Sequence, residues 1–517
     1  MCEGCGDCGV QSNCIALEPL ETDSGRKRRI NQSVCNQDLS CLKGFCPSFV
    51  TLEGAKPRSR AADLSKLGDI TSRLPEPERP DVGDTFSVLV TGIGGNGVVT
   101  VGAILGMAAH LEGRLATVLD MSGFAQRNGA VLSHVRITGK AQQEHSARIP
   151  ERGLDLLIGC DAIVTGNADS IRMMEPGNTR VLVNDFVAPT SGFAADPDMR
   201  MDFSRFAQVI AERVGEENLY RVNATDAAMA LVGDAIGANM FLVGHAWQKG
   251  LLPLSRQSLE AAITTNGAAV GMNRAAFDLG RMAAADPDGF ARLTGNAKPK
   301  VSALTPATLD EVVATRAAHL TAYQDERLAR RYRAFIDRVV AAEKAAGTDG
   351  LAIVVARVLA KLLAYKDEYE VARLFSRPSF QKGLSEQFEG DYRIAFNLAP
   401  PFLSRRNPAT GRLVKRSYGP MMLKAFRLLA RLKGLRGTVF DPFGRHSHRK
   451  LERALADEYE TLVERLMTTL RPDNAADHIA IAAIYDGIRG YDVVKEEAIE
   501  RARAAVADAL KKQAPPA

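Results

Sequence analysis

The segment that decides the fold is Phe86-Ser87-Val88-Leu89-Val90-Thr91, followed at once by Gly92-Ile93-Gly94-Gly95-Asn96-Gly97. The first six residues are mostly apolar and rich in β-formers, which predicts a short buried strand. Residues 98–111 then predict a helix, and residues 115–119 predict a second strand. A strand, a glycine turn, a helix and a strand in this order predict parallel pairing within a doubly wound, Rossmann-like α/β sheet.

The glycine turn follows the pattern G-x-G-G-x-G between a strand and a helix. A phosphate group binds well at such a helix N-terminus, so the candidate cofactor-binding residues are Gly92, Gly94, Gly95 and Gly97. Asp120, which ends the second predicted strand, is a candidate partner for a ribose hydroxyl. The alternative is that the glycines only permit close packing of the strand against the helix, and that Asp120 merely ends a strand.

The polar segment 121–136 lies at the carboxyl end of a predicted strand, the edge at which open α/β sheets bind ligands. Gln126 is a further candidate cofactor-binding residue in this segment. The candidates for lining a cleft or a subunit contact are Arg127, Ser133, His134 and Arg136. The alternative is a loop followed by a strand. We expect His134 to be a hydrogen-bonded structural histidine, because no nucleophile pattern accompanies it.

Further strands are predicted at 154–158, 162–164 and 180–184, and helices at 227–250 and 259–267. We therefore place an α/β domain at 85–285, between a proline-containing linker at 54–84 and a second linker at 286–305. Residues 306–510 show helical periodicity without an alternating strand, which predicts an all-α domain. Its first helix is expected to start at Thr305-Pro306, with a hydroxyl at the N-cap and proline at the first helical position.

Seven of the eight cysteines fall within an N-terminal module at residues 1–53. Cys2, Cys5 and Cys8 are spaced C-x2-C-x2-C, and Cys46 is followed by Pro47, which is the pattern of ferredoxin-like [4Fe–4S] ligation. We expect these four cysteines to hold one cluster. The thiols expected around a second site are Cys14, Cys35 and Cys41. With three obvious thiolates, this site has a non-cysteine ligand, holds a three-iron cluster, or is empty.

Zinc and disulfides are the alternatives for these thiols. C-x2-C is also a zinc spacing, but zinc sites usually pair two C-x2-C knuckles, whereas the second half of this module reads C-x5-C-x4-C-P. Disulfides are disfavoured because no apolar signal segment precedes Cys2, and the thiols of a cytoplasmic chain stay reduced. We therefore expect a cytoplasmic metal-binding protein.

The bulk composition bounds the class of protein. A length of 517 residues with 46% hydrophobic and 25% charged residues is typical of a globular chain of about three domains. No apolar run is long enough to span a bilayer, so we expect no membrane segment. The net charge of +5 is small, but residues 401–450 are strongly basic. This block predicts a solvated helix face, a dock for an acidic protein, or a phosphate-binding patch.

Several motifs together resemble the carboxyl-terminal part of the long, fused bacterial indolepyruvate ferredoxin oxidoreductases, members of the 2-oxoacid:ferredoxin oxidoreductase family. The residues that carry the resemblance are the cysteine triplet 2–8, Phe45-Cys46-Pro47-Ser48-Phe49-Val50, the Gly92 turn, and residues 246–251, 364–374, 398–401 and 435–444. The resemblance implies an iron–sulfur module, a gamma-type oxidoreductase domain and a helical C-terminal domain.

The family's reaction is the oxidative decarboxylation of an aryl pyruvate with coenzyme A, which delivers two electrons to ferredoxin. The resemblance therefore implies electron transfer through [4Fe–4S] clusters, with ferredoxin as a partner and an oligomeric assembly. The usual G-D-G signature of thiamine diphosphate and magnesium binding is not found, and Gly233-Asp234-Ala235 does not match it. We therefore expect the thiamine-binding domains to lie on a separate partner chain, or this chain to be the product of a truncated gene.

Two other functions are compatible with parts of the sequence. A non-catalytic iron–sulfur or zinc protein could bind nucleic acid through residues 401–450, but we do not expect this because aromatic residues are scarce, at 6%. A nucleotide-dependent reductase using Gly92 and Asp120 lacks a second cofactor motif. The first expectation is thus the electron-transfer and scaffold portion of an aryl pyruvate ferredoxin oxidoreductase, inactive alone.

Overall fold

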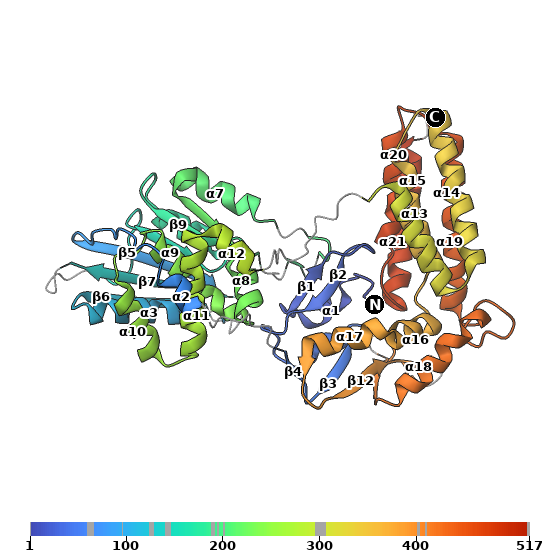
Figure 1. Ribbon diagram of the computed structural model, residues 1–517. Helices are drawn as coiled ribbons and strands as arrows, with labels where there is room; N and C mark the ends of the chain where they lie inside the picture. The colour runs from blue at the N-terminus through green and yellow to red at the C-terminus, as the bar shows by residue number, and fades with distance from the viewer. Residues whose placement is uncertain are drawn as a thin grey trace.

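The computed structural model describes residues 2–58, 67–95, 97–123, 129–139, 146–187, 192–193, 196–199, 202–294, 307–400, 404–408 and 411–513. Figure 1 shows two lobes, an α/β domain at one end and a largely helical region at the other. The N-terminal strands and first helix lie between the lobes and against the helical one.

A six-stranded sheet forms the centre of the α/β domain, in the order β10-β9-β8-β5-β7-β6. Its strands are β5 (Thr85–Ile93), β6 (Leu115–Ser122), β7 (Ala130–Thr138), β8 (Leu156–Gly159), β9 (Arg180–Asn184) and β10 (Leu219–Val222). The pairs from β5 to β10 are parallel, but β7 runs antiparallel to both β5 and β6. The predicted parallel pairing is therefore wrong for the two strands of the first strand–helix–strand unit, because β7 is inserted between β5 and β6 and runs antiparallel to both.

Alternation along β5 explains how the sheet is covered on both faces. Val88 and Val90 belong to one hydrophobic core, and Leu89 between them belongs to the other. Since successive side chains of a strand point to opposite faces, each face needs its own layer of helices. Helix α3 (Val98–Leu111) covers the first face with Val101, Ile104 and other apolar residues at helical spacing.

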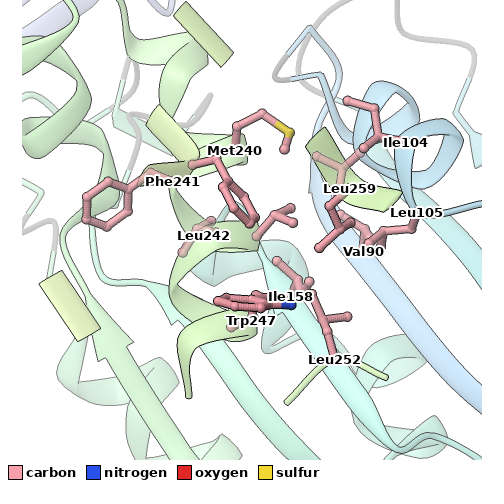
Figure 2. Packing of buried hydrophobic residues seen from close by; sticks show 14 of the residues in the cluster. Val90, Ile104, Leu105, Ile158, Met240, Phe241, Leu242, Trp247, Leu252 and Leu259 are labelled. Atoms are coloured by element: carbon pink, nitrogen blue, oxygen red, sulfur yellow. The ribbon is translucent and has the colours of Figure 1, made fainter. Parts of the chain in front are cut away.

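The other helices of this domain are α4 (Ala162–Thr165), α5 (Ala168–Met173), α7 (Ser204–Val214), α8 (Ala224–Leu231), α9 (Ala238–Gln248), α10 (Arg256–Asn266), α11 (Val270–Ala285) and α12 (Pro287–Leu293). Short 3-10 turns lie at η2 (Glu216–Asn218) and η3 (Ala235–Gly237). Every residue of α9 is buried. Figure 2 shows Trp247 of α9 beside Ile158 and Leu252 in the first core. The strand predicted at 162–164 is instead α4, because Asp161 Oδ1 accepts the N–H groups of Ile163 and Val164 and caps a helix.

The N-terminal module contains α1 (Asp7–Ser12), the hairpin of β1 (Leu17–Leu20) and β2 (Lys27–Ile30), and η1 (Ser40–Lys43). Two further strands follow, β3 (Val50–Glu53) at the end of the module and β4 (Lys56–Pro57) just after it. Both pair with strands from the C-terminal region. Within the segment expected to be a linker, α2 (Leu67–Thr71) packs on α11, where Arg281 Nη2 donates to the Thr71 carbonyl at 3.2 Å.

The C-terminal region is mostly helical. Its helices are α13 (Leu309–Tyr323), α14 (Glu326–Ala346), α15 (Leu351–Leu363), α16 (Glu368–Ser376), α17 (Pro378–Gln387), α18 (Met422–Arg431), α19 (Ser447–Thr468), α20 (Ala475–Ala483) and α21 (Val493–Gln513), with 3-10 turns η4 (Leu432–Leu435) and η5 (Ile484–Gly487). Thr308, not the expected Thr305, caps α13 in a capping box with Glu311. Thr305 and Pro306 lie outside the described residues. No helix in the described ranges is both long and apolar enough to span a membrane.

The expectation of an all-α C-terminal domain is wrong. Its strands are β11 (Phe388–Glu389), β12 (Arg393–Leu398) and β13 (Arg416–Tyr418), and β12 pairs antiparallel with both β13 and β3. Phe396 of β12 packs with Phe375 and Phe426 in a small separate core. This core holds the three-stranded sheet onto α16 and α18, so the N-terminal module and the C-terminal region share one sheet.

Candidate functional site

The first group of thiols consists of Cys2, Cys5, Cys8 and Cys46. Burial raises the pKa of Cys5 to about 12, and the nearby Cys46, Asp7 and Cys2 contribute to the rise. Burial likewise raises the pKa of Cys8, with further contributions from Cys46, Cys2 and Cys5. The four side chains therefore lie within electrostatic range of one another. Residues 2–8 curl tightly around this point, because Gly4 and Gly6 both have positive φ, at 75° and 77°.

Asp7 ties the two halves of this group together. Its Oδ2 accepts the Phe45 N–H at 2.6 Å, so the turn that carries Cys5 and Cys8 is fixed to the segment that carries Cys46. Arg412 from the C-terminal region donates to both carboxylate oxygens, at 2.9 and 2.8 Å. The Asp7 side chain is buried, so this bidentate ion pair is an internal brace rather than a surface contact.

Cations surround the first group of thiols. Lys366, whose side chain is 5% exposed, lies 3.0 Å from Glu3 Oε1. Burial lowers the pKa of Lys366, but the charges of Glu3, Cys46 and Cys2 outweigh this effect and the net pKa is raised. Lys415 Nζ donates to the carbonyls of Leu42, at 3.0 Å, and of Gly44. Positive charge is therefore directed at the thiols from the C-terminal region.

The second group consists of Cys14, Cys35 and Cys41. Burial raises the pKa of Cys41 to about 11, and Cys14, Cys35 and Asp38 add to the rise. Burial also raises the pKa of Cys14, again with contributions from Cys35 and Asp38. These three thiols thus form a group distinct from the first. The negative charge of Asp38 acts on both Cys14 and Cys41.

All eight cysteines are free thiols. Within the part of the chain that the structure describes, no three Cys, His, Asp or Glu side chains are arranged to hold a single metal ion. The eighth cysteine, Cys160, is buried in the α/β domain, and burial raises the pKa of its thiol to about 12.

The module also contacts the α/β domain. Arg28 Nη2 donates to the Pro197 carbonyl at 2.6 Å, and its guanidinium lies 4.4 Å from the centre of the Phe193 ring. Arg26 donates to the Asp198 and Met199 carbonyls at 2.8 and 2.9 Å. Because Arg28 also lies within electrostatic range of Cys2 and Cys8, the first group of thiols adjoins both lobes.

The glycine turn joins β5 to α3. Gly97, with φ of 73°, precedes the first turn of α3, and Gly94 N–H donates to the Gly129 carbonyl at 2.9 Å. A Cβ on Gly97 would lie 2.6 Å from Asn239 Nδ2 of α9, so the turn is closely packed there. This arrangement accounts for Gly92 and Gly97 by packing alone. A Cβ added to Gly95 would meet no atom within 4 Å, and Gly95 is exposed at the tip of the turn.

The residues predicted to line a cleft do not lie together in the described part of the structure. Gln126 and Arg127 lie outside the described residues. His134 is buried in β7, where its Nδ1 accepts the Ile149 N–H at 3.2 Å and burial lowers its pKa, so the expectation of a structural histidine is confirmed. Ser133 is buried and packs against Gly102 of α3, while Arg136 donates to the Ser146 carbonyl at 2.7 Å. The structure therefore gathers none of these three into a cleft.

Asp120 is exposed on β6, the edge strand. The interpretation of Asp120 as a ribose ligand requires its strand to lie next to the strand of the glycine turn. The insertion of β7 separates β6 from β5, so this interpretation is wrong.

The basic block 401–450 does not form one surface. Arg412 and Lys415 point into the N-terminal module, while Arg436 pairs with Asp367 and Arg449 pairs with Glu452 inside the protein. Exposed cations lie on α18, at Lys424, Arg427 and Arg431, and elsewhere in the block, at Arg405, Arg416, Arg445 and Lys450. Of the three interpretations of this block, the solvated helix face agrees with the exposed cations of α18, whereas the buried cations form ion pairs inside the protein.

Residues 87–283 match the family described as pyruvate ferredoxin/flavodoxin oxidoreductase. This match covers the α/β domain. Residues 309–508 match a family of unknown function, DUF6537.

Curated relatives match the same α/β domain. Indolepyruvate oxidoreductase subunit IorB of Pyrococcus horikoshii is 28% identical over 207 residues, which are 38% of this chain and 96% of the relative. The same subunit of Methanothermobacter thermautotrophicus is 25% identical over 205 residues, 39% of this chain and 98% of the relative. Among solved structures, subunit PORC of a pyruvate oxidoreductase from Thermotoga maritima matches 38% of this chain and 96% of its own, with 17% identity and a TM-score of 0.28.

Sequence reasoning missed the groups that hold the thiol site together. Asp7, Lys366, Arg412 and Lys415 have no motif of their own. One signal for Asp7 was present, namely an acidic residue inside the cysteine triplet. The partners from the C-terminal region are more than 300 residues away in sequence, and no local pattern connects them to the module.

Proposed function

We propose that this chain is the electron-transfer and scaffold portion of a 2-oxoacid:ferredoxin oxidoreductase that acts on an aryl pyruvate such as indolepyruvate. The observation that carries the proposal is an oxidoreductase domain at 87–283 in contact with a module that gathers seven cysteines into two groups. The relatives named indolepyruvate oxidoreductase subunit IorB support the substrate class.

The first group of thiols fits a [4Fe–4S] cluster. Cys2, Cys5, Cys8 and Cys46 would be its ligands, and when bound it would accept and release one electron at a time. Thiolates carry negative charge that the iron and sulfide core neutralises only in part, and reduction adds one more electron. The cations Lys366 and Lys415 would stabilise that charge, and the Gly4 N–H already donates to Cys2 Sγ at 3.2 Å. Both effects set the reduction potential of such a cluster.

The remaining cofactors and partners of the reaction would be divided between this chain and other chains. Thiamine diphosphate and magnesium would be held by a partner chain or by thiamine-binding domains, since the sequence shows no thiamine signature. Coenzyme A would be the acyl acceptor, and ferredoxin would take the electrons. The glycine turn at Gly92–Gly97, with Gly95 exposed at its tip, is the candidate contact for coenzyme A or for the thiamine-binding partner. The C-terminal region braces the thiol module from the opposite side.

Anaerobic reconstitution of the full chain with iron and sulfide tests the proposal. We expect broad visible absorbance, iron and sulfide in about equal amounts, and reduction of ferredoxin by the reduced protein. Substitution Cys5→Ser should lower the iron content, whereas the matched change Cys160→Ser, at a buried thiol in the other domain, should leave it unchanged. Zinc on metal analysis with no visible absorbance would refute the electron-transfer role.

A further inference from the structure

The two halves of the cysteine module repeat the same local backbone. In the first half, Gly4 has a φ of 75° and its N–H donates to Cys2 Sγ at 3.2 Å. In the second half, Gln37 has a φ of 58° and its N–H donates to Cys35 Sγ at 3.4 Å. Each pair is a cysteine and the residue two positions later. A positive φ is uncommon outside glycine, so its recurrence at Gln37 marks a required turn.

The correspondence continues into the following turn. Gly6 precedes α1 with a φ of 77°, and Leu39 precedes η1 with a φ of 56°. In both cases a cysteine is the second residue of the short helix, Cys8 in α1 and Cys41 in η1. The first turn is closed in the same way, by Gly9 N–H to the Gly6 carbonyl at 2.8 Å and by Leu42 N–H to the Leu39 carbonyl at 2.9 Å.

This equivalence aligns Cys2-x2-Cys5-x2-Cys8 with Cys35-x2-Asp38-x2-Cys41. The central thiol of the first triplet therefore has a carboxylate as its counterpart in the second. The closing thiols are exchanged between the halves, because Cys46 lies within electrostatic range of Cys5 and Cys8, whereas Cys14 lies within range of Cys41. Such an exchange is the arrangement of two-cluster ferredoxins, in which the fourth cysteine of each run binds the other cluster.

We propose that Asp38 is the fourth protein ligand of the second iron–sulfur site, together with Cys14, Cys35 and Cys41. This inference rests on the proposed function. It supplies the ligand that the cysteine count alone leaves open.

The surroundings of Asp38 suit a ligand carboxylate. Its Oδ1 accepts the Ser40 N–H at 3.0 Å and the Ser40 hydroxyl at 2.9 Å. These two bonds orient the carboxylate, as outer-shell partners of ligand carboxylates do, and Oδ2 can face the metal. The side chain is exposed, and its charge acts on both Cys14 and Cys41. An oxygen ligand is harder than a thiolate, so the iron that it binds is held less firmly than the others.

The test compares the full chain with the variants Asp38→Ala, Asp38→Cys and Asp23→Ala, all reconstituted anaerobically. Asp23 is the matched control, because it is an exposed aspartate of the same module that belongs to neither group of thiols. We expect Asp38→Ala to lose about one iron per chain with unchanged sulfide, and to show the electron paramagnetic resonance signal of an oxidised three-iron cluster. Asp23→Ala should match the natural chain. Asp38→Cys should keep the full iron content and retain it under a chelator that removes one iron from the natural chain.

Other results would overturn the inference in distinguishable ways. If Asp38→Ala keeps both the iron content and the spectrum of the natural chain, Asp38 is not a ligand, while the proposed function stands. If the natural chain binds only the iron of one cluster, about four per chain, the second site does not exist and the inference fails alone. If the natural chain binds no iron, both the inference and the proposed electron transfer fail.

Discussion

The ion pair between Asp7 and Arg412 makes the strongest quantitative prediction. Asp7 accepts two hydrogen bonds from Arg412 and one from the Phe45 N–H, and its side chain is 7% exposed. In Arg412→Met the carboxylate keeps only the Phe45 bond and remains buried without a counter-ion. Breaking a buried pair costs about 3–5 kcal/mol. The Arg412 side chain is 24% exposed, so water replaces part of the loss and we expect about 1.5–3 kcal/mol.

Hydrogen exchange is the suitable assay, because this chain has several domains and a single unfolding free energy is not defined for it. Exchange of the amides at residues 41–46 reports local opening of the segment that Asp7 holds. The expected loss corresponds to exchange about 10- to 100-fold faster in Arg412→Met, at about 1.4 kcal/mol per tenfold change. The matched control is Arg405→Met, an exposed arginine nearby in the chain. Equal exchange rates in the two variants would refute the brace between the C-terminal region and the thiol module.

Three further predictions concern the stability of each lobe. Burial, with a smaller contribution from Lys249, lowers the pKa of His245 from 6.5 to about 4, so below pH 6.5 the unfolded chain binds more protons than the folded one. The free energy of unfolding of the α/β domain should therefore fall by about 1.4 kcal/mol per pH unit between pH 6.5 and pH 4. Unfolding followed by the fluorescence of the single tryptophan, Trp247, should show a flatter pH dependence in His245→Leu. Gly280→Ala should unfold that domain at markedly lower temperature by the same fluorescence, because its Cβ would overlap the Phe241 carbonyl of α9; Gly271→Ala, where an added Cβ meets nothing within 4 Å, is the control. Arg436→Met leaves Asp367 as a buried unpaired charge and should destabilise the helical lobe by about 3–5 kcal/mol in circular dichroism, whereas Arg436→Met with Asp367→Asn should recover part of the loss.

Local patterns predicted the local structure of the α/β domain well. The strand at 86–91, the glycine turn and the helix at 98–111 follow from side-chain periodicity, and the structure places them at β5 and α3. The order of strands did not follow, because the insertion of β7 depends on pairing across the sheet rather than on nearby residues. The short apolar run at 162–164 was predicted as a strand because three or four residues cannot distinguish the two periods; the Asp161 cap was the signal for a helix.

Long-range pairing explains the remaining errors. Nothing within residues 393–398 indicates a partner strand at 50–53, so the C-terminal region was predicted to be entirely helical. The cysteine spacing and the electrostatic contacts divide the seven thiols into the same two groups, while their ligation of iron stays a prediction. The equivalence of Asp38 with Cys5 was present in the spacing. It becomes persuasive only when the backbone of the two halves is compared, because one acidic residue between cysteines has no significance by itself.

These long-range contacts also indicate why the helical C-terminal region accompanies the cysteine module. Strand β3 begins three residues after Pro47, at Val50, and takes its backbone partner from β12. The counter-ions of the half-buried Glu3 and the buried Asp7 are Lys366 and Arg412, both from the same region. Without that region, the module would expose an unpaired strand edge and two acidic groups beside thiols that are themselves negative when they bind metal. A small cysteine module of this kind has little hydrophobic core of its own, so the C-terminal region supplies both its missing strand partner and its neutralising charge.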